Sequence, residues 1–218
     1  MDGLLIIKWI PIYLSIPFLI FLIVWLLNAY NFIDGVDGLA ASMTIFISLT
    51  LALVLFFTEN IDYLTTLFIL LAGVVGGFIV FNWPPASIFM GDAGSVYLGY
   101  IFGSLFLYTT LNGYISIWVW LTVSAYFLAD TTITQLIRVI FVRKWFLPHR
   151  SHAYQNFARI SDSHAKVTIG ITVYNVIWIL PLTLFAAFIP EWGFIFSILA
   201  LIPATLFSFR YGPLFSSS

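Results

Sequence analysis

The chain alternates between long apolar runs and short polar segments. Seven runs are apolar on all sides, at residues 10–27, 39–57, 63–81, 96–108, 114–137, 167–189 and 192–209. A membrane-spanning helix needs about 20 mostly apolar residues, whereas the strands of a membrane barrel alternate polar and apolar positions. The pattern therefore predicts an all-α membrane bundle of about seven transmembrane helices. We expect the short fourth run to extend back toward Gly91.

Composition supports this class. Of the 218 residues, 62% are hydrophobic and 8% are charged, and the mean hydropathy is +1.08. A soluble domain averages about 45–50% apolar and about 25% charged residues. We therefore predict one integral membrane domain over residues 1–218, with the lipid bilayer as its surroundings. A net charge of −1 argues against a nucleic-acid partner, and the absence of cysteine excludes disulfides and thiol catalysis.

The basic residues predict the orientation in the membrane. Six of the eight lie between the fifth and sixth runs, at Arg138, Arg143, Lys144, Arg150, Arg159 and Lys166. Basic residues concentrate in cytoplasmic loops, which places this segment inside the cell. Counting spans back places segments 28–38 and 82–94 on the same face. The polar loops thus predict a site at the cytoplasmic face of a plasma membrane.

The first polar cluster carries an amide or a carboxylate at every third residue, at Asn28, Asn31, Asp34 and Asp37. A continuous helix would turn by about two and a half revolutions over this distance, so its ends would point apart. The four side chains can converge only if the helix breaks, which Gly35 and Gly38 permit. Such oxygen donors suit Mg²⁺ or a polar sugar and base. The alternative is a polar helix end followed by turn residues.

The second cluster lies at 81–99. Pro84 and Pro85 end the third run, and Asp92 stands between Gly91 and Gly94 just before the next helix. A carboxylate there can bind a metal while backbone N–H groups of the helix start hold phosphate oxygens. Asp92 as a plain helix cap is the alternative.

The third cluster mixes His149, Arg150, His152 and His164 with further basic residues. Arg and protonatable His suit a phosphate ligand, and the spacing only loosely resembles a zinc site. A basic loop that merely sets the topology is the other interpretation. Asp130, inside the fifth run, is costly at membrane depth and is equally compatible with structural pairing, with Arg138 or neighbouring threonines, and with function.

The three clusters, in this order, resemble the polyprenyl-phosphate N-acetylhexosamine-1-phosphate transferases, which include the MraY-type and WecA-type enzymes. The matching motifs are NAYNFIDGVDGLA, NWPPASIFMGDAGS and HRSHAYQ, the last followed by Ser163, His164, Val167 and Thr168. The HRSHAYQ form is most similar to the branch that initiates O-antigen and related surface polysaccharides.

The resemblance implies transfer of a sugar-1-phosphate from a UDP-N-acetylhexosamine to undecaprenyl phosphate, with Mg²⁺ required and UMP released. It implies catalytic roles for Asp34, Asp37, Asp92, His149 and His152, with Asp92 as the magnesium ligand. It implies substrate binding by Asn28, Asn31, Asn82, Phe89, Gly91, Arg143, Lys144 and Arg150. The sequence does not identify the sugar that is transferred. GlcNAc and its 6-deoxy relatives FucNAc and QuiNAc are all compatible.

One family element is absent from this sequence. The family carries an aspartate-rich DDxxD motif upstream of the first cluster, whereas this chain has no adjacent acidic pair. We therefore expect the chain to correspond to the C-terminal two-thirds of a longer family fold. Two alternatives stay open, an inactive homologue that only binds a nucleotide-sugar or partners, and a transporter or channel subunit that uses Asp34, Asp37, Asp92 and Asp130 as an ion path.

Overall fold

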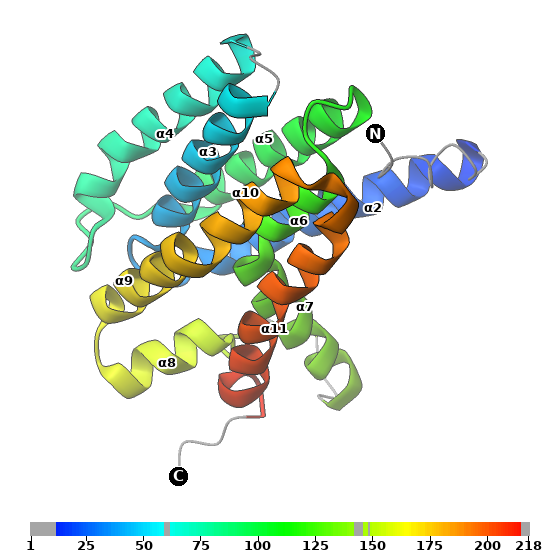
Figure 1. The fold of residues 1–218 in the computed structure, drawn as a ribbon. Helices are drawn as coiled ribbons and strands as arrows, with labels where there is room; N and C mark the ends of the chain where they lie inside the picture. Colours follow the sequence, from blue (N-terminus) through cyan, green and yellow to red (C-terminus); the bar gives the residue numbers. More distant parts are fainter. Residues whose placement is uncertain (1–11, 59–61, 142–145, 148, 215–218) are drawn as a thin grey trace.

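The computed structural model describes residues 12–58, 62–141, 146–147 and 149–214, and the side chains from residue 16 onward. Within these ranges every regular element is a helix (Figure 1). The helices are α2 (Ile12–Ile33), α3 (Leu39–Thr58), α4 (Asp62–Asn82), α5 (Gly91–Leu111), α6 (Ile117–Val123), α7 (Ala125–Phe141), α8 (Ala153–Ser161), α9 (His164–Tyr174), η1 (Asn175–Ile179), α10 (Leu180–Phe188), η2 (Pro190–Trp192) and α11 (Gly193–Tyr211). The predicted all-α class is confirmed.

Five segments of the described chain are long and apolar enough to cross a membrane. They are Ile16–Ile33, Leu39–Thr58, Asp62–Asn82, His164–Phe188 and Pro190–Tyr211. The fourth predicted run is a single helix, α5, that starts at Gly91 as expected. The fifth is divided at Ser124 into α6 and α7. The structure therefore supports five spans by length and composition, and the predicted total of seven is not reached on these criteria.

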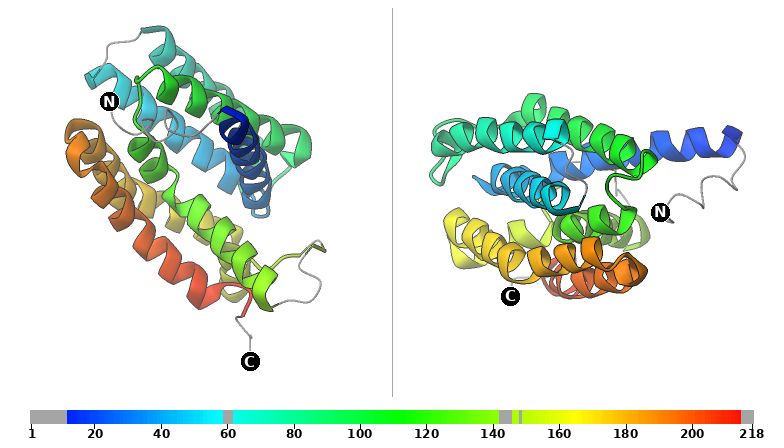
Figure 2. Two further views of the ribbon diagram at one scale, coloured as in Figure 1. Left: turned by 90° about the vertical axis from the view of Figure 1, so that its right-hand side faces the viewer. Right: turned by 45° about the horizontal axis from the view of Figure 1, so that its top comes forward.

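The helices form layers around α3. In the right-hand view of Figure 2, α3 lies between α4 and α5 on one side and α9 and α10 on the other. α2 packs along α5, and α11 packs along α7. A π-helical turn, η1, joins α9 to α10 just before Pro181, so these three elements form one continuous rod.

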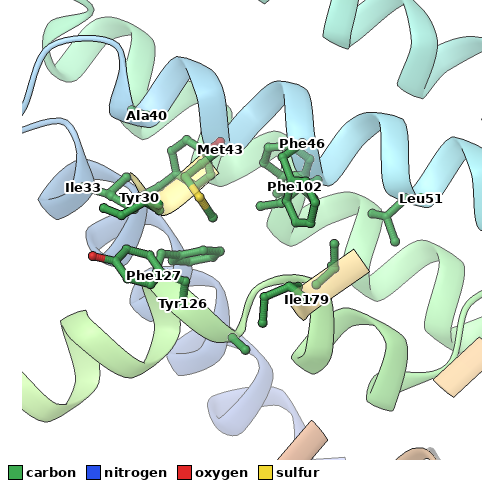
Figure 3. Close-up of a cluster of buried hydrophobic side chains, with 14 of the residues drawn as sticks. Tyr30, Ile33, Ala40, Met43, Phe46, Leu51, Phe102, Tyr126, Phe127 and Ile179 are labelled. Atoms are coloured by element: carbon green, nitrogen blue, oxygen red, sulfur yellow. The ribbon is translucent and has the colours of Figure 1, made fainter. Parts of the chain in front are cut away.

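The core lies where α2, α3, α5 and α7 approach each other. Tyr30, Met43, Phe102 and Phe127 gather there (Figure 3), and each is at least 95% buried. The ring centroids of Tyr30 and Phe102 are 5.5 Å apart. Because this cluster fixes the end of α2 against the start of α3, it also fixes the turn between them, which carries two of the predicted site residues.

Candidate active site

The turn between α2 and α3 divides the first polar cluster. α2 ends at Ile33, and Gly38 has a φ of +74°, a conformation that side chains other than glycine rarely adopt. Asn28 and Asn31 therefore lie on the last turns of α2, whereas Asp34 and Asp37 lie in the turn. The predicted helix break is present at the glycines.

Asn31 and Asn28 have different surroundings. The Oδ1 atom of Asn31 accepts a hydrogen bond of 2.7 Å from Ser95 on α5, which directs it toward the second cluster. Asn28 is exposed, donates 2.7 Å to the carbonyl of Val24, and lines a cavity of about 620 Å³ together with His149. Asn31 thus faces α5, whereas Asn28 faces the cavity beside His149. The four polar residues of the first cluster therefore do not all converge.

Three carboxylates lie close enough to influence one another. The pKa of Asp34 is raised to about 6, mainly by burial and to a smaller extent by the negative charges of Asp92 and Asp37. A hydrogen bond from the backbone of Gly91 opposes the shift. The start of α5 therefore faces the α2–α3 turn, and the two acidic motifs of the sequence meet in space.

Asp92 is not a helix cap. It lies in the first turn of α5, whose N-cap residue is Met90, and no side chain caps that helix. Among the described residues no side-chain hydrogen bond to the Asp92 carboxylate is formed, and Asp92 and Gly91 are exposed. The capping alternative is therefore not what the structure shows, and the carboxylate is available to a ligand.

Asp37 joins three segments of the chain. Its Oδ2 atom accepts 3.2 Å from the backbone N–H of Ala86 and lies 3.2 Å from Nδ1 of His164. Its carbonyl oxygen accepts 2.9 Å from the hydroxyl of Thr168 on α9. The sequence predicted a catalytic role for Asp37, and the structure shows a residue engaged in holding the α4–α5 loop and α9 against the α2–α3 turn.

Asn82 is a second internal connector. It is 3% exposed, its Oδ1 atom accepts 3.0 Å from the N–H of Gly38, and its Nδ2 atom donates 2.9 Å to the carbonyl of Ile88. The sequence predicted that Asn82 binds substrate, whereas its amide is used here inside the fold. One consequence is that the loop presents Phe89, whose side chain is 73% exposed, just before Gly91.

The histidines of the third cluster separate. His149 and His152 stack with ring centroids 5.1 Å apart, whereas His164 pairs with Asp37. The pKa of His149 is lowered to about 4, mainly by burial and to a smaller extent by nearby His152 and Arg138. Among the described residues no three His, Cys, Asp or Glu side chains are grouped as a metal site, which gives the zinc interpretation no support.

The basic residues of this cluster are only partly described. Arg150 is exposed and lines a mostly polar pocket of about 290 Å³ together with Gly35, Arg159 and His164. The pocket borders the acidic turn, so positive and negative side chains lie at one end of the bundle. Arg143 and Lys144, which were predicted to bind substrate, lie outside the described residues.

Asp130 is the residue whose role the sequence left open. It is 1% exposed, and its carboxylate accepts hydrogen bonds from the ring of His152, from the backbone N–H of Ala153 and from Ser208 on α11. Neighbouring Thr131 donates to the carbonyl of Phe127 on its own helix. An acid within an apolar run was the signal, but its partner 22 positions away could not be read from the sequence.

Comparison of the sequence with known protein families identifies the family to which the chain belongs. The family model of glycosyl transferase family 4 matches residues 2–110, which is half of the chain and includes both acidic motifs. The chain belongs to glycosyl transferase family 4. The basic cluster lies beyond the part of the family model that matches.

Curated family relatives match over different lengths. A phospho-N-acetylmuramoyl-pentapeptide-transferase of Clostridium beijerinckii is 43% identical over 94 residues, 43% of this chain and 28% of that protein. A probable undecaprenyl-phosphate N-acetylglucosaminyl 1-phosphate transferase of Bacillus subtilis is 30% identical over 169 residues, 76% of this chain and 47% of that protein. A phospho-N-acetylmuramoyl-pentapeptide-transferase of Streptococcus mutans is 30% identical over 163 residues, 73% and 45% respectively. The chain spans less than half the length of these relatives.

Proposed function

We propose that this protein transfers an N-acetylated sugar-1-phosphate from a UDP-sugar to undecaprenyl phosphate and releases UMP, at the cytoplasmic face of a bacterial plasma membrane. The names of the curated relatives support a phospho-sugar transferase of this kind. The HRSHAYQ motif supports a place at the start of O-antigen or related surface polysaccharide synthesis.

The observation that carries the proposal is the meeting of Asp34 and Asp92 at the start of α5. Asp34 is partly buried beside two further carboxylates, and burial, together with their negative charge, raises its pKa to about 6. Like charges at close range are unfavourable unless a cation or a proton balances them. A site that accepts a cation together with a phosphate substrate fits this requirement, because the backbone N–H groups at the start of α5 point to the same place.

The donor set fits Mg²⁺. Magnesium is usually held by one or two carboxylates, with substrate phosphates and water completing its coordination, so a full cage of protein ligands is not needed. Asp92 and Asp34 are the residues that would hold it. When bound, the ion would neutralise charge on the diphosphate, which is the main requirement of phosphoryl transfer.

The surrounding residues offer contacts for the other parts of the two substrates. Phe89 offers an exposed aromatic face beside the acidic residues, which suits a uracil base or a sugar ring. Arg150 and Arg159 line the polar pocket next to Gly35 and can balance phosphate charge. The cavity beside His149 is walled by Trp25, Phe32 and other apolar side chains, which suits the first isoprene units of a lipid phosphate.

The test is UMP release from a panel of UDP-N-acetylhexosamines by membranes that carry this chain and undecaprenyl phosphate. We expect release that requires both the lipid and Mg²⁺. Asp92→Asn should lower it by at least about 100-fold, as removal of an important electrostatic group at a reacting phosphate does. Asp62→Asn is the matched control, because Asp62 is exposed at the opposite end of α4.

The possible outcomes distinguish the alternatives. Release that survives in Asp92→Asn would remove Asp92 from the reaction. Binding of a UDP-sugar without any release would favour the binding-only homologue, and solute movement without release would favour the transporter. The UDP-sugar that supports the fastest release identifies the natural substrate class.

A further inference from the structure

A buried acid–histidine pair lies beside the candidate site, and its acid, Asp130, has no assigned role. Oδ2 of Asp130 lies 3.2 Å from Nδ1 of His152. Oδ1 of Asp130 accepts 3.0 Å from the N–H of Ala153 and 3.1 Å from the hydroxyl of Ser208. An ionised carboxylate can only accept, so beside an ionised Asp130 it is Nδ1 of His152 that carries the proton.

The ring of His152 is held in one orientation. It stacks with His149, at 5.1 Å and 25°, and with Tyr154, at 5.6 Å and 27°, and the ring of Phe32 lies 5.4 Å away. The backbone N–H of His152 donates 3.3 Å to Oε1 of Gln155, which fixes the start of α8. The imidazole can therefore present its second nitrogen in only one direction.

That second nitrogen, Nε2, is buried and has no hydrogen-bond partner among the described residues. A buried polar atom without a partner costs about 1–3 kcal/mol, so its retention calls for an explanation. Phe32 and His149, which both contact the ring, line the cavity of about 620 Å³. The imidazole thus lies one side chain behind the wall of a cavity at the candidate site.

We propose that Asp130 is a positioning residue that holds His152 with its proton on Nδ1, so that Nε2 is kept for a phosphate oxygen of a substrate. The inference rests on the proposed transfer reaction. When the ring takes a second proton from a protonated phosphate or from solvent, Nε2–H donates to the phosphate and the carboxylate of Asp130 balances the positive charge. This is how a buried acid sets the tautomer of a functional histidine.

The direct test is ¹⁵N NMR of the full chain labelled at histidine, in lipid nanodiscs. The chain has three histidines, so His152→Gln identifies the signals of His152. We expect the wild-type ring to be protonated at Nδ1. Asp130→Asn should move the proton to Nε2, because the Asn side-chain amide can donate to Nδ1. Ser208→Ala, which removes another bond to the same carboxylate, should leave the tautomer unchanged.

Two ligand additions identify the source of the phosphate. Undecaprenyl phosphate alone and a UDP-sugar alone are titrated separately, and the one that occupies the site should shift the Nε2 signal in wild-type protein but not in Asp130→Asn. In the UMP assay, Asp130→Asn should lower the rate at saturating substrate by about 10–100-fold, as loss of the outer partner of a ligating imidazole does. Ser208→Ala should retain most of the rate.

The results that overturn the inference are specific. A wild-type ring protonated at Nε2 refutes it without any variant, even if Asp130→Asn does not fold. An Nε2 signal that responds to neither phosphate ligand refutes the phosphate role, and equal losses of activity in Ser208→Ala and Asp130→Asn reduce Asp130 to a structural anchor. Because the tautomer is read without turnover, a chain that releases no UMP but shows the expected tautomers refutes the proposed reaction and not the pairing.

Discussion

The polar side chains at this end of the bundle fall into two groups. Asp37, Asn82 and Asp130 each bond a backbone N–H of another segment, and these bonds connect parts of the chain that are far apart in the sequence. Asp34 and Asp92 face each other with little internal compensation. Residues of the first group hold the loops together, and we propose that those of the second bind a ligand.

The burial of His149 can be tested through the titration of this one group. Burial lowers its pKa from 6.5 to about 4 in the folded protein, so the unfolded chain binds the proton more readily. The resulting contribution to stability is present above about pH 6.5 and is lost as the pH falls toward about 4. We expect His149→Gln to lose less thermal stability than wild type between about pH 7 and about pH 5.

The measurement is a series of thermal unfolding curves in detergent across this pH range. Both proteins share every other titrating group, including Asp34, so only the difference between them reports on His149. Parallel curves for the two proteins would show that His149 has the same proton affinity in both states and is not buried as described.

The acidic residues could be identified from the sequence because a charged residue next to an apolar run is conspicuous. The role of each acidic residue could not be identified in the same way. The partners of Asp37 are Ala86 and His164, 49 and 127 positions away, and the partner of Asp130 lies across a loop. Such pairings depend on how whole helices pack, which local periodicity does not encode.

At the scale of helices, the contact between α2 and α5 positions the two acidic motifs. A Cβ atom at Gly99 would lie 2.8 Å from the Cα atom of Leu27, so the two backbones touch there. The same contact places Ser95 within hydrogen-bond distance of Asn31. Small residues permit this close approach in membrane helices.

We therefore expect Gly99→Ala to destabilise the protein by about 1–3 kcal/mol, since overpacking against a backbone cannot be relieved by a side-chain rotation. Gly73→Ala is the matched control, because a Cβ there meets nothing within 4 Å. Thermal unfolding in detergent measures both variants. Equal stability of the two would show that α2 and α5 are not in close contact at Gly99.

Helix bounds were predictable where hydropathy alone defines them. The run at 39–57 became Leu39–Thr58 and the run at 63–81 became Asp62–Asn82. α2 continues to Ile33, six residues beyond the predicted end, because Asn28 bonds the carbonyl of Val24 on its own helix and Asn31 bonds Ser95 of α5. The break at Ser124 was missed because no glycine or proline marks it.

At the scale of the whole molecule, the three polar segments meet at one end of the bundle. The bonds of Gly38 to Asn82 and of Asp37 to His164 connect them directly. The opposite end is joined mainly by aromatic contacts such as Trp118 with Phe194, and by the hydroxyls of Tyr63 and Tyr108. Sequence predicted this asymmetry from the distribution of polar and basic residues.

The orientation of this polar end is the last prediction. If basic loops lie inside, the end carrying Asp34 and Asp92 faces the cytoplasm, where UDP-sugars are available. The natural chain has no cysteine, so single cysteines need no background removal. Ser87 is exposed at the polar end and Asn112 is exposed at the other. In intact cells a membrane-impermeant maleimide should label Asn112→Cys, and it should label Ser87→Cys only after the membrane is opened. The reverse pattern would place the carboxylates outside, away from any UDP-sugar, and would refute the proposed reaction whatever the purified protein binds.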